Sequence, residues 1–219
     1  MMDLFGSDFE PIPLVDADVI MFRNAPLGQD YGALLKTLID ETPWRSETIK
    51  MWGKFVLQPR LIAWYGEPGT TYTYSGIELT PKAWTKTILD IKQRIEVLSQ
   101  HPFNSVLLNY YRNHRDSMGF HSDDEPELGD RPTIASLSLG EERRFQLRHK
   151  YRRDLKPVTI PLPDGSLLIM RGNTQKNWKH GIPKERIPCG PRVNLTFRSI
   201  TLSGMPDGSI QRISAGRRR

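Results

Sequence analysis

Residues 192–198 read RVNLTFR, a strict alternation of polar and apolar side chains. A period of two is that of a β-strand, because successive side chains of a strand point to opposite faces of its sheet. One face of this strand is apolar, and the other carries Arg192, Asn194, Thr196 and Arg198. A core strand does not turn two guanidinium groups to one side unless an anionic or strongly polar group lies there. The alternative is a solvent-facing strand with scattered charges, and the residues alone leave both interpretations open.

The same period of two recurs throughout the second half of the chain. Short alternating runs that predict strands occupy residues 106–111, 133–139, 144–149, 158–162, 166–170 and 193–200. Asp164 and Gly165 separate two of these runs and favour a two-residue hairpin turn, because both residue types tolerate a positive φ angle. Many short strands of this kind predict an antiparallel sandwich or a jelly roll.

Two helices are predicted upstream of the strands. The first follows Asp30, a favourable N-cap, and continues until Pro43. The second begins with Thr80 as its N-cap and Pro81 at the first helical position. Its apolar residues recur at spacings of four and three, at Trp84, Ile88, Ile91, Ile95 and Leu98. We therefore expect an α+β fold, mainly β, in which N-terminal helices brace one sheet.

The composition describes a single domain with a basic surface. The 219 residues suffice for one core, so we expect one domain over residues 1–219, with flexible ends at 1–12 and 204–219. Lys and Arg outnumber Asp and Glu by 31 to 25, which gives a net charge of +6 and a pI near 9.5. A nucleic acid could neutralise the cations that gather in residues 141–156, although a solvated strand face would carry the same charges. These cations are Arg143, Arg144, Arg148, Lys150, Arg152, Arg153 and Lys156.

The sequence also limits where the protein works. It contains no apolar stretch near the roughly 18 residues of a membrane span, and its acidic, proline-broken start is unlike a secretory signal. The sole cysteine, Cys189, excludes an intramolecular disulfide and suits a reducing compartment. We therefore expect an intracellular protein that does not enter a membrane, cytoplasmic in a bacterium or nuclear in a eukaryote.

Residues 119–123 read GFHSD and place a histidine and an aspartate two positions apart. In an extended segment, His121 and Asp123 project to the same face and can bind one ion. His180 could supply a third ligand from a neighbouring strand. Two imidazoles and a carboxylate on one side of a metal are the ligand set of non-haem iron(II) oxygenases, which leaves positions open for a cosubstrate and dioxygen. Zinc accepts similar ligands, and an isolated His-x-Asp is more often structural or on the surface.

Several motifs taken together resemble the AlkB family of dioxygenases over residues 52–200. The motifs that stand in the order and approximate spacing of that family are NYY at 109–111, HSD at 121–123, His180 and RVNLTFR at 192–198. The resemblance is strongest to the branch that acts on duplex DNA. Stretches similar to that branch are TYTYSG at 71–76, PTIASLSLG at 132–140 and PRVNLTFR at 191–198.

The resemblance implies a fold and a set of cofactors. The fold would be a double-stranded β-helix, with a jelly-roll core over about residues 104–202. Fe(II) would be bound by His121, Asp123 and His180, and would act with dioxygen and 2-oxoglutarate as cosubstrates. The residues that would hold 2-oxoglutarate are Asn109, Tyr111, Arg192, Thr196 and Arg198.

The resemblance also implies contacts to a nucleic-acid base, from hairpins at about residues 48–78. Tyr72 and Tyr74 would lie around the damaged base, and Asp124 would hydrogen-bond to it. Residues 51–54 (MWGK) fit a hairpin tip, where Trp52 would fill the gap left by a flipped base. The alternative role for Tyr72 and Tyr74 is packing within a β-sheet, and the alternative for Trp52 is an ordinary half-buried anchor. The full set of predicted substrate contacts is Trp52, Gly53, Lys54, Tyr72, Tyr74 and Asp124.

The activity that this resemblance implies is oxidative demethylation of N-alkylated bases in DNA, of the 1-methyladenine and 3-methylcytosine type. Formaldehyde would be released while 2-oxoglutarate and dioxygen become succinate and CO2. A monomer acting on single- or double-stranded alkylated DNA, or on RNA, is expected. Duplex-preferring relatives carry a compact basic run where this chain has residues 183–187 (PKERI), and Glu185 and Ile187 interrupt that run, so a preference for duplex is in doubt.

Four alternatives remain open. The same dioxygenase fold could demethylate RNA or hydroxylate a protein side chain. The chain could bind nucleic acid without catalysis, although retention of all three ligands and both arginines argues against that. A zinc-dependent hydrolase could use the same three ligands, but hydrolysis gives no reason for the polar face of residues 192–198.

Overall fold

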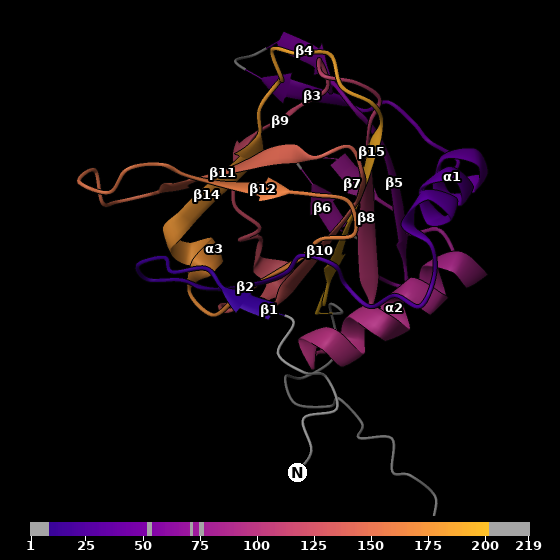
Figure 1. The fold of residues 1–219 in the computed structure, drawn as a ribbon, viewed down its shortest axis with the longest axis horizontal. Coiled ribbons are helices and arrows are strands. Elements are labelled where there is room, and N and C mark those ends of the chain that lie inside the picture. The colour runs from indigo at the N-terminus through magenta and orange to yellow at the C-terminus, as the bar shows by residue number, and fades with distance from the viewer. Residues whose placement is uncertain (1–8, 52–53, 71, 75–76, 202–219) are drawn as a thin grey trace, which may run out of the picture.

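The computed structural model describes residues 9–51, 54–70, 72–74 and 77–201, and Figure 1 shows their arrangement. Within these residues, two antiparallel sheets pack against each other. The seven-stranded sheet runs in the order β1 (Phe9–Pro11), β2 (Asp18–Phe22), β13 (Leu167–Arg171), β10 (Ile134–Gly140), β15 (Arg192–Arg198), β8 (Ser105–Tyr111) and β5 (Leu61–Gly66). The four-stranded sheet runs in the order β12 (Val158–Leu162), β11 (Arg143–His149), β14 (Trp178–Ile182) and β9 (Met118–His121).

The strands β8 to β15 form the jelly-roll core that the sequence predicted. Four of these strands lie in the large sheet and four in the small sheet. The chain changes sheet at each connection between β8 and β15 except β11 to β12, which is a paired hairpin. Two further hairpins, β3 (Thr48–Met51) with β4 (Lys54–Leu57) and β6 (Tyr72–Tyr74) with β7 (Ile77–Leu79), precede this core. The predicted flexible ends fall mostly on residues 1–8 and 202–219, outside the described residues.

Helices cover the outer face of the large sheet beside β5 and β8 (Figure 1). They are α1 (Tyr31–Glu41) and α2 (Lys86–Ser99), and short turns form η1 (Pro126–Leu128) and α3 (Thr174–Asn177). Buried apolar residues gather in two layers, one between the helices and the large sheet and the other between the two sheets. The large sheet therefore buries both of its faces.

Strand β15 lies in the middle of the large sheet, between β10 and β8, and all seven of its residues are buried. Val193, Leu195 and Phe197 belong to the layer under the helices. The polar residues of the strand consequently face the space between the sheets. The alternative of a solvent-facing strand with scattered charges is wrong, because helices cover its apolar face and the small sheet covers its polar face.

Two local predictions need correction. Helix α2 is capped by Thr85, whose Oγ1 accepts a 3.3 Å hydrogen bond from the N–H of Ile88, and not by Thr80. The preceding residues pair with the edge strand instead, since the N–H of Lys82 donates to the carbonyl of Trp64 at 2.9 Å. Backbone pairing with β5 delays the start of the helix by five residues.

The turn at Asp164 and Gly165 joins two sheets rather than two paired strands. In this turn the N–H of Ser166 donates to the carbonyl of Pro163 at 3.1 Å, and Gly165 has a φ of 74°. However, β12 pairs with β11 in the small sheet, while β13 pairs with β10 and β2 in the large one. A Cβ at position 165 would lie 2.0 Å from the ring of Tyr31, so glycine is required there for space as well as for φ.

Candidate metal centre and cosubstrate pocket

Two adjacent strands of the small sheet carry the two histidines of the predicted metal site. His121 is the last residue of β9, and His180 lies in the middle of β14. These strands are antiparallel neighbours in which His180 pairs with His121, so both imidazoles start from the same level of the sheet. Asp123 follows two residues after His121, and its N–H donates to Oε1 of Gln175 at 3.0 Å. The pairing of β9 with β14 thus joins ligands that are far apart in the sequence.

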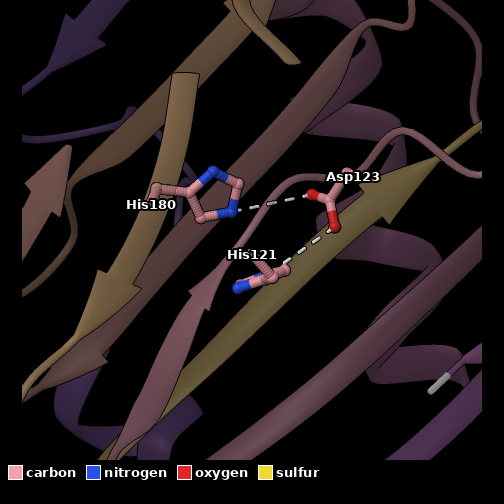
Figure 2. A group of neighbouring side chains, drawn as sticks. All are labelled: His121, Asp123 and His180. Atoms are coloured by element: carbon pink, nitrogen blue, oxygen red, sulfur yellow. Dashed lines mark ion pairs between the residues drawn. The ribbon is translucent and has the colours of Figure 1, made fainter. Parts of the chain in front are cut away.

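The three side chains point toward one another (Figure 2). Nε2 of His121 lies 3.8 Å from Oδ1 of Asp123, and Nε2 of His180 lies 4.0 Å from Oδ2. One ligand atom from each residue lies within 4.8 Å of the other two. A cation about 2 Å from each donor needs the donors roughly 3 to 3.5 Å apart. Small side-chain rotations therefore suffice to surround an ion.

The protonation states of the three residues are those of metal ligands. Nδ1 of His121 lies 3.0 Å from the carbonyl oxygen of Gly119, which can only accept, so Nδ1 donates and Nε2 keeps its lone pair. Burial lowers the pKa of His121, and burial lowers the pKa of His180 to about 3. Burial raises the pKa of Asp123, but the guanidinium of Arg198 and the imidazoles of His180 and His121 together outweigh burial and hold this pKa at about 2. At neutral pH the site offers two neutral imidazoles and one carboxylate.

An unpaired oxygen shows that these residues fit a cation. Oδ2 of Asp123 is buried and has no hydrogen-bond partner among the described residues. A buried, unpaired carboxylate oxygen is costly, and a cation between it and the two imidazoles would remove that cost. Two nitrogens and one oxygen on one side of an ion suit Fe(II), although zinc accepts the same donors.

Strands β8 and β15 form one wall of a pocket that opens onto these ligands. The register pairs Arg192 with Tyr111 and Asn194 with Asn109, so polar side chains of the two strands lie side by side. The pocket is lined by the three metal-ligand candidates and by every residue predicted to hold 2-oxoglutarate, namely Asn109, Tyr111, Arg192, Thr196 and Arg198. The structure therefore brings both predicted groups to one cavity.

Arg192 supplies a positive charge with unused donors to this pocket. Its side chain is fully buried, and Nη2 donates to Oγ of Ser138 at 2.9 Å. Nε and Nη1 have no hydrogen-bond partner within the described part of the chain. Burial lowers the pKa of Arg192 to about 10, so the group stays charged at neutral pH. A carboxylate is the ligand that such a guanidinium binds best.

Arg198 has a different partner, although it lies on the same face of the same strand. Its Nη2 donates to Oδ1 of Asp123 at 2.7 Å, and both side chains are almost completely buried. This ion pair favours the ionised carboxylate and holds it beside the two imidazoles. Between the two arginines, Oγ1 of Thr196 donates to Oδ1 of Asn194 at 3.0 Å. Hydrogen bonds within the protein thus hold the polar side chains of β15 in place.

A protein-family model described as the 2OG-Fe(II) oxygenase superfamily matches residues 19–198. The chain belongs to this superfamily. Membership implies Fe(II) as the metal, with 2-oxoglutarate and dioxygen as cosubstrates, and the residues around the pocket fit that requirement. The match covers the jelly-roll core together with the helices and hairpins that precede it.

Three relatives place the chain in the AlkB family of this superfamily, as its motifs predicted. The human alpha-ketoglutarate-dependent dioxygenase alkB homolog 3 is 46% identical over 175 residues, which cover 76% of this chain and 60% of that protein. The human DNA oxidative demethylase ALKBH2 is 41% identical over 161 residues, which cover 71% of this chain and 62% of that protein. The Arabidopsis thaliana DNA oxidative demethylase ALKBH2 is 37% identical over 213 residues, which cover 84% of this chain and 67% of that protein. The chain spans about 60% of the length of the human relatives.

A solved structure supports the fold of this AlkB-family chain. The structure of OsALKBH1 superimposes with a TM-score of 0.55 at 16% identity, covering 86% of this chain and 100% of that one. Such a likeness concerns the fold alone. Among the described residues, the helices are too short or too polar to cross a membrane.

The residues predicted to contact a substrate are only partly described. Trp52 and Gly53 lie outside the described residues. Lys54 begins β4, and Tyr72 and Tyr74 are the first and last residues of β6, where the structure describes the backbone. Their roles stay predictions.

Asp124, the remaining predicted contact, lies at the surface directly after the candidate ligand Asp123. Its side chain is 56% exposed, and Oδ2 accepts a 2.7 Å hydrogen bond from Nζ of Lys150. Asp124 is not among the residues that line the pocket around the metal ligands. A substrate base would therefore meet Asp124 outside that pocket.

Several polar residues of the site were not predicted from the sequence. Nε of the buried Arg60 donates to Oδ1 of Asn109 at 2.7 Å, and Nδ2 of Asn194 donates to Oγ of Ser136 at 2.9 Å. Ser136 and Ser138 alternate with apolar residues in β10, a signal that could have placed them on the pocket face. Arg60 and Gln175 carry no such signal, because neither belongs to an alternating run.

Proposed function

We propose that this protein is an Fe(II)- and 2-oxoglutarate-dependent dioxygenase that removes methyl groups from N-alkylated bases in DNA. The observation that carries the proposal is one cavity lined by two neutral imidazoles, an unpaired carboxylate oxygen and a guanidinium with unused donors. A metal-dependent hydrolase would need the two imidazoles and the carboxylate but not the buried guanidinium of Arg192. An enzyme that binds a dicarboxylate beside its metal needs the guanidinium as well.

Each group has a task in this proposal. His121, Asp123 and His180 would hold Fe(II), which, with dioxygen and 2-oxoglutarate, supplies the oxidising power to hydroxylate a methyl group while succinate and CO2 form. Arg192 would bind the carboxylate of 2-oxoglutarate that lies farther from the metal, because it lines the pocket and its Nε and Nη1 have no hydrogen-bond partner among the described residues. Arg198 would hold Asp123 in place. A hydroxymethyl group on a ring nitrogen then breaks down to formaldehyde and the unmodified base.

The nucleic-acid substrate is supported by the relatives and by surface charge. Two of the relatives described above are named DNA oxidative demethylases. Strand β11 exposes Arg144 and Arg148, and the guanidinium of Arg148 lies 4.1 Å from the centre of the ring of Phe120. Cations beside an exposed aromatic ring suit a phosphate backbone with stacked bases. A DNA substrate places the protein inside the cell, and we further propose that it acts as a monomer.

The interrupted basic run argues for single-stranded over duplex substrate. Oε2 of Glu185 lies 2.7 Å from Nη2 of Arg144. This ion pair neutralises a guanidinium that could otherwise bind a phosphate of a second DNA strand. With fewer cations free to meet phosphates, duplex binding is weaker and less dependent on salt. Tyr72 and Tyr74 remain the proposed contacts to the flipped base, and Trp52 remains the residue proposed to fill the gap that this base leaves.

The test is reconstitution under anaerobic conditions with Fe(II) and 2-oxoglutarate, followed by dioxygen and an oligonucleotide that carries 1-methyladenine or 3-methylcytosine. We expect formaldehyde and succinate in equal amounts, and an unmethylated base. Single-stranded DNA, duplex DNA, RNA and a methylated peptide in the same assay separate the substrate classes. Turnover by His121→Ala at the wild-type rate, or turnover that needs zinc rather than iron, would refute the proposal.

A further inference from the structure

Lys150 connects the basic cluster of β11 to the metal site. It follows directly after β11, and its side chain is only 12% exposed. Nζ donates to Oδ2 of Asp124 at 2.7 Å and to the carbonyl oxygen of Gln175 at 2.8 Å. A lysine that served only to attract phosphate would hold its ammonium group in water. Lys150 instead directs its charge inward, to two acceptors.

The two acceptors of Lys150 lead to the metal ligand by separate routes. Asp124 is the next residue after Asp123 in the chain. Gln175 is almost completely buried, and its Oε1 accepts from the N–H of Asp123 at 3.0 Å. Lys150, Gln175 and residues 123–124 therefore close a ring of hydrogen bonds. The ring ties the exposed carboxylate of Asp124 to the backbone of Asp123.

The backbone around Lys150 is held as well. Its N–H donates to the carbonyl of Asn177 at 2.7 Å. Immediately afterwards, Nδ1 of His149 accepts from the N–H groups of Tyr151 at 3.2 Å and Arg152 at 3.0 Å. The ammonium group thus projects from a fixed turn, which lowers the entropic cost of keeping it on Asp124.

One oxygen of Asp124 stays available. Oδ2 is engaged by Lys150, while Oδ1 has no hydrogen-bond partner within the described residues and the side chain is exposed. An ionised carboxylate can only accept hydrogen bonds. With Lys150 on one oxygen, the other can point in few directions, so it can distinguish an N–H donor from an oxygen at one position of a ligand.

We propose that Lys150 is a positioning residue that sets base specificity by orienting Asp124 toward the amino group of a methylated base. The proposal rests on the proposed function. In 1-methyladenine and 3-methylcytosine, an exocyclic amino group lies beside the methylated ring nitrogen and can donate to Oδ1. In 3-methylthymine a carbonyl oxygen occupies that place, and the two oxygens would repel each other. A discriminating carboxylate works only if its orientation is fixed.

The test is a double-mutant cycle with Lys150→Met, Asp124→Asn and the combined variant. Single-turnover rates and affinities are measured on oligonucleotides that carry 1-methyladenine, 3-methylthymine or no lesion. If Lys150 acts through Asp124, Lys150→Met lowers kcat/KM for 1-methyladenine about tenfold, and the same change in the Asp124→Asn background has less than about a threefold effect. The preference for 1-methyladenine over 3-methylthymine falls by a similar factor.

Two further variants separate positioning from charge and from folding. Lys150→Arg keeps a cation within reach of Asp124 and should restore at least part of the preference. Lys176→Met removes one exposed positive charge from α3, beside Gln175, without touching Asp124, and should leave the preference unchanged. Melting temperatures of all variants identify any that fail to fold.

The outcomes decide between two roles for Lys150. Effects that multiply in the combined variant, with equal losses on all three oligonucleotides, would show that Lys150 binds phosphate and would overturn the proposal. Absence of formaldehyde from wild-type protein on every lesion would instead refute the proposed function. In that case the same double-mutant cycle can be measured by binding. The quantity is the affinity of the Mn(II)-loaded protein for the oligonucleotide with 1-methyladenine relative to the unmodified one, and it still tests whether Lys150 acts through Asp124.

Discussion

Arg192 and Arg198 lie on one face of one strand, yet their surroundings differ. Arg198 gives Nη2 to the carboxylate of Asp123, so its charge is matched inside the protein. Arg192 is equally buried, but its Nη2 donates to the neutral hydroxyl of Ser138. A buried charge without a counter-charge is stable only when something else offsets it. This difference is why we assign ligand binding to Arg192 and ligand support to Arg198.

The assignment predicts the effect of Arg192→Met. Loss of a charge-assisted pair with a carboxylate should raise the KM for 2-oxoglutarate by about 10- to 100-fold, because such pairs contribute roughly 1.5 to 3 kcal/mol. The KM for the oligonucleotide should change little. Succinate formation measured against the concentration of 2-oxoglutarate checks this. Arg171→Met, which removes a surface ion pair with Asp18, is the matched control, and an equal rise in both variants would contradict the assignment.

At the scale of single residues, the sequence predicts those parts of the site in which the spacing of residues along a strand determines the face to which their side chains point. His121 and Asp123 lie two apart, as do the polar residues of β15, and such residues share a face of an extended chain. Arg60, Gln175 and the role of Lys150 could not be predicted this way. Their contacts depend on how distant loops and turns meet, which no local period records.

At the scale of elements, the pairing of β9 with β14 determines whether the metal site exists. Gly181 follows His180 at the irregularity of this pairing, and a Cβ there would lie 2.9 Å from the carbonyl oxygen of Met118. That distance is shorter than the backbone can accept without separating the strands. The close approach of β14 to β9, and with it the meeting of the two histidines, therefore depends on a glycine at position 181.

Gly181→Ala should consequently weaken both stability and metal binding. We expect a loss of about 1 to 3 kcal/mol in the free energy of unfolding, typical of overpacking, and weaker binding of Fe(II) or Mn(II). Chemical denaturation and metal titration measure the two effects. Gly119→Ala is the control on the partner strand, because a Cβ there meets no atom within 4 Å. Equal losses of stability and metal affinity in the two variants would show that neither property depends on the close approach of β14 to β9.

The corrected start of α2 gives a second prediction for an element. Thr85→Ala removes the side-chain acceptor for the N–H of Ile88 and should lower the free energy of unfolding by about 1 kcal/mol. Thr80→Ala should have little effect, since Thr80 lies in the extended segment before the helix. Urea denaturation of both variants distinguishes them. A larger loss of unfolding free energy in Thr80→Ala than in Thr85→Ala would show that Thr80 is the N-cap, as the sequence pattern predicts.

Among the elements, periodicity predicts strands whose two faces differ in polarity. Each of the six predicted runs overlaps an observed strand, including β8, β10 and β15. Strand β5 reads LIAWYG and is buried on both faces, so it shows no alternation. Strand β14 escapes prediction for another reason, because His180 and Gly181 serve the site and the close approach of the strands rather than a pattern of polarity.

At the scale of the whole molecule, the two sheets explain how a polar site can lie in a protein interior. Helices bury the outer face of the large sheet, so its inner face is free to carry charged groups toward the small sheet. The candidate metal ligands come from the small sheet and from the loop that follows β9, and the residues predicted to hold 2-oxoglutarate come from the large sheet. Ligands bound between them should therefore hold the two sheets together.

This arrangement predicts a stability that depends on ligands. Mn(II), an inert substitute for Fe(II), together with 2-oxoglutarate should raise the melting temperature, because a ligand at 100 times its Kd adds about 2.7 kcal/mol. A chelator should reverse the increase. In His180→Ala the shift should be lost, and thermal unfolding with and without the ligands measures it. The same shift in wild type and variant would mean that the metal binds elsewhere.

The most direct measurement is a crystal structure of the protein with Mn(II) and 2-oxoglutarate, with the metal located by anomalous scattering. We predict one strong peak about 2 Å from Nε2 of His121, a carboxylate oxygen of Asp123 and Nε2 of His180, with 2-oxoglutarate on the metal and its far carboxylate on Arg192. A peak at other residues, or 2-oxoglutarate outside the pocket between the sheets, would contradict it.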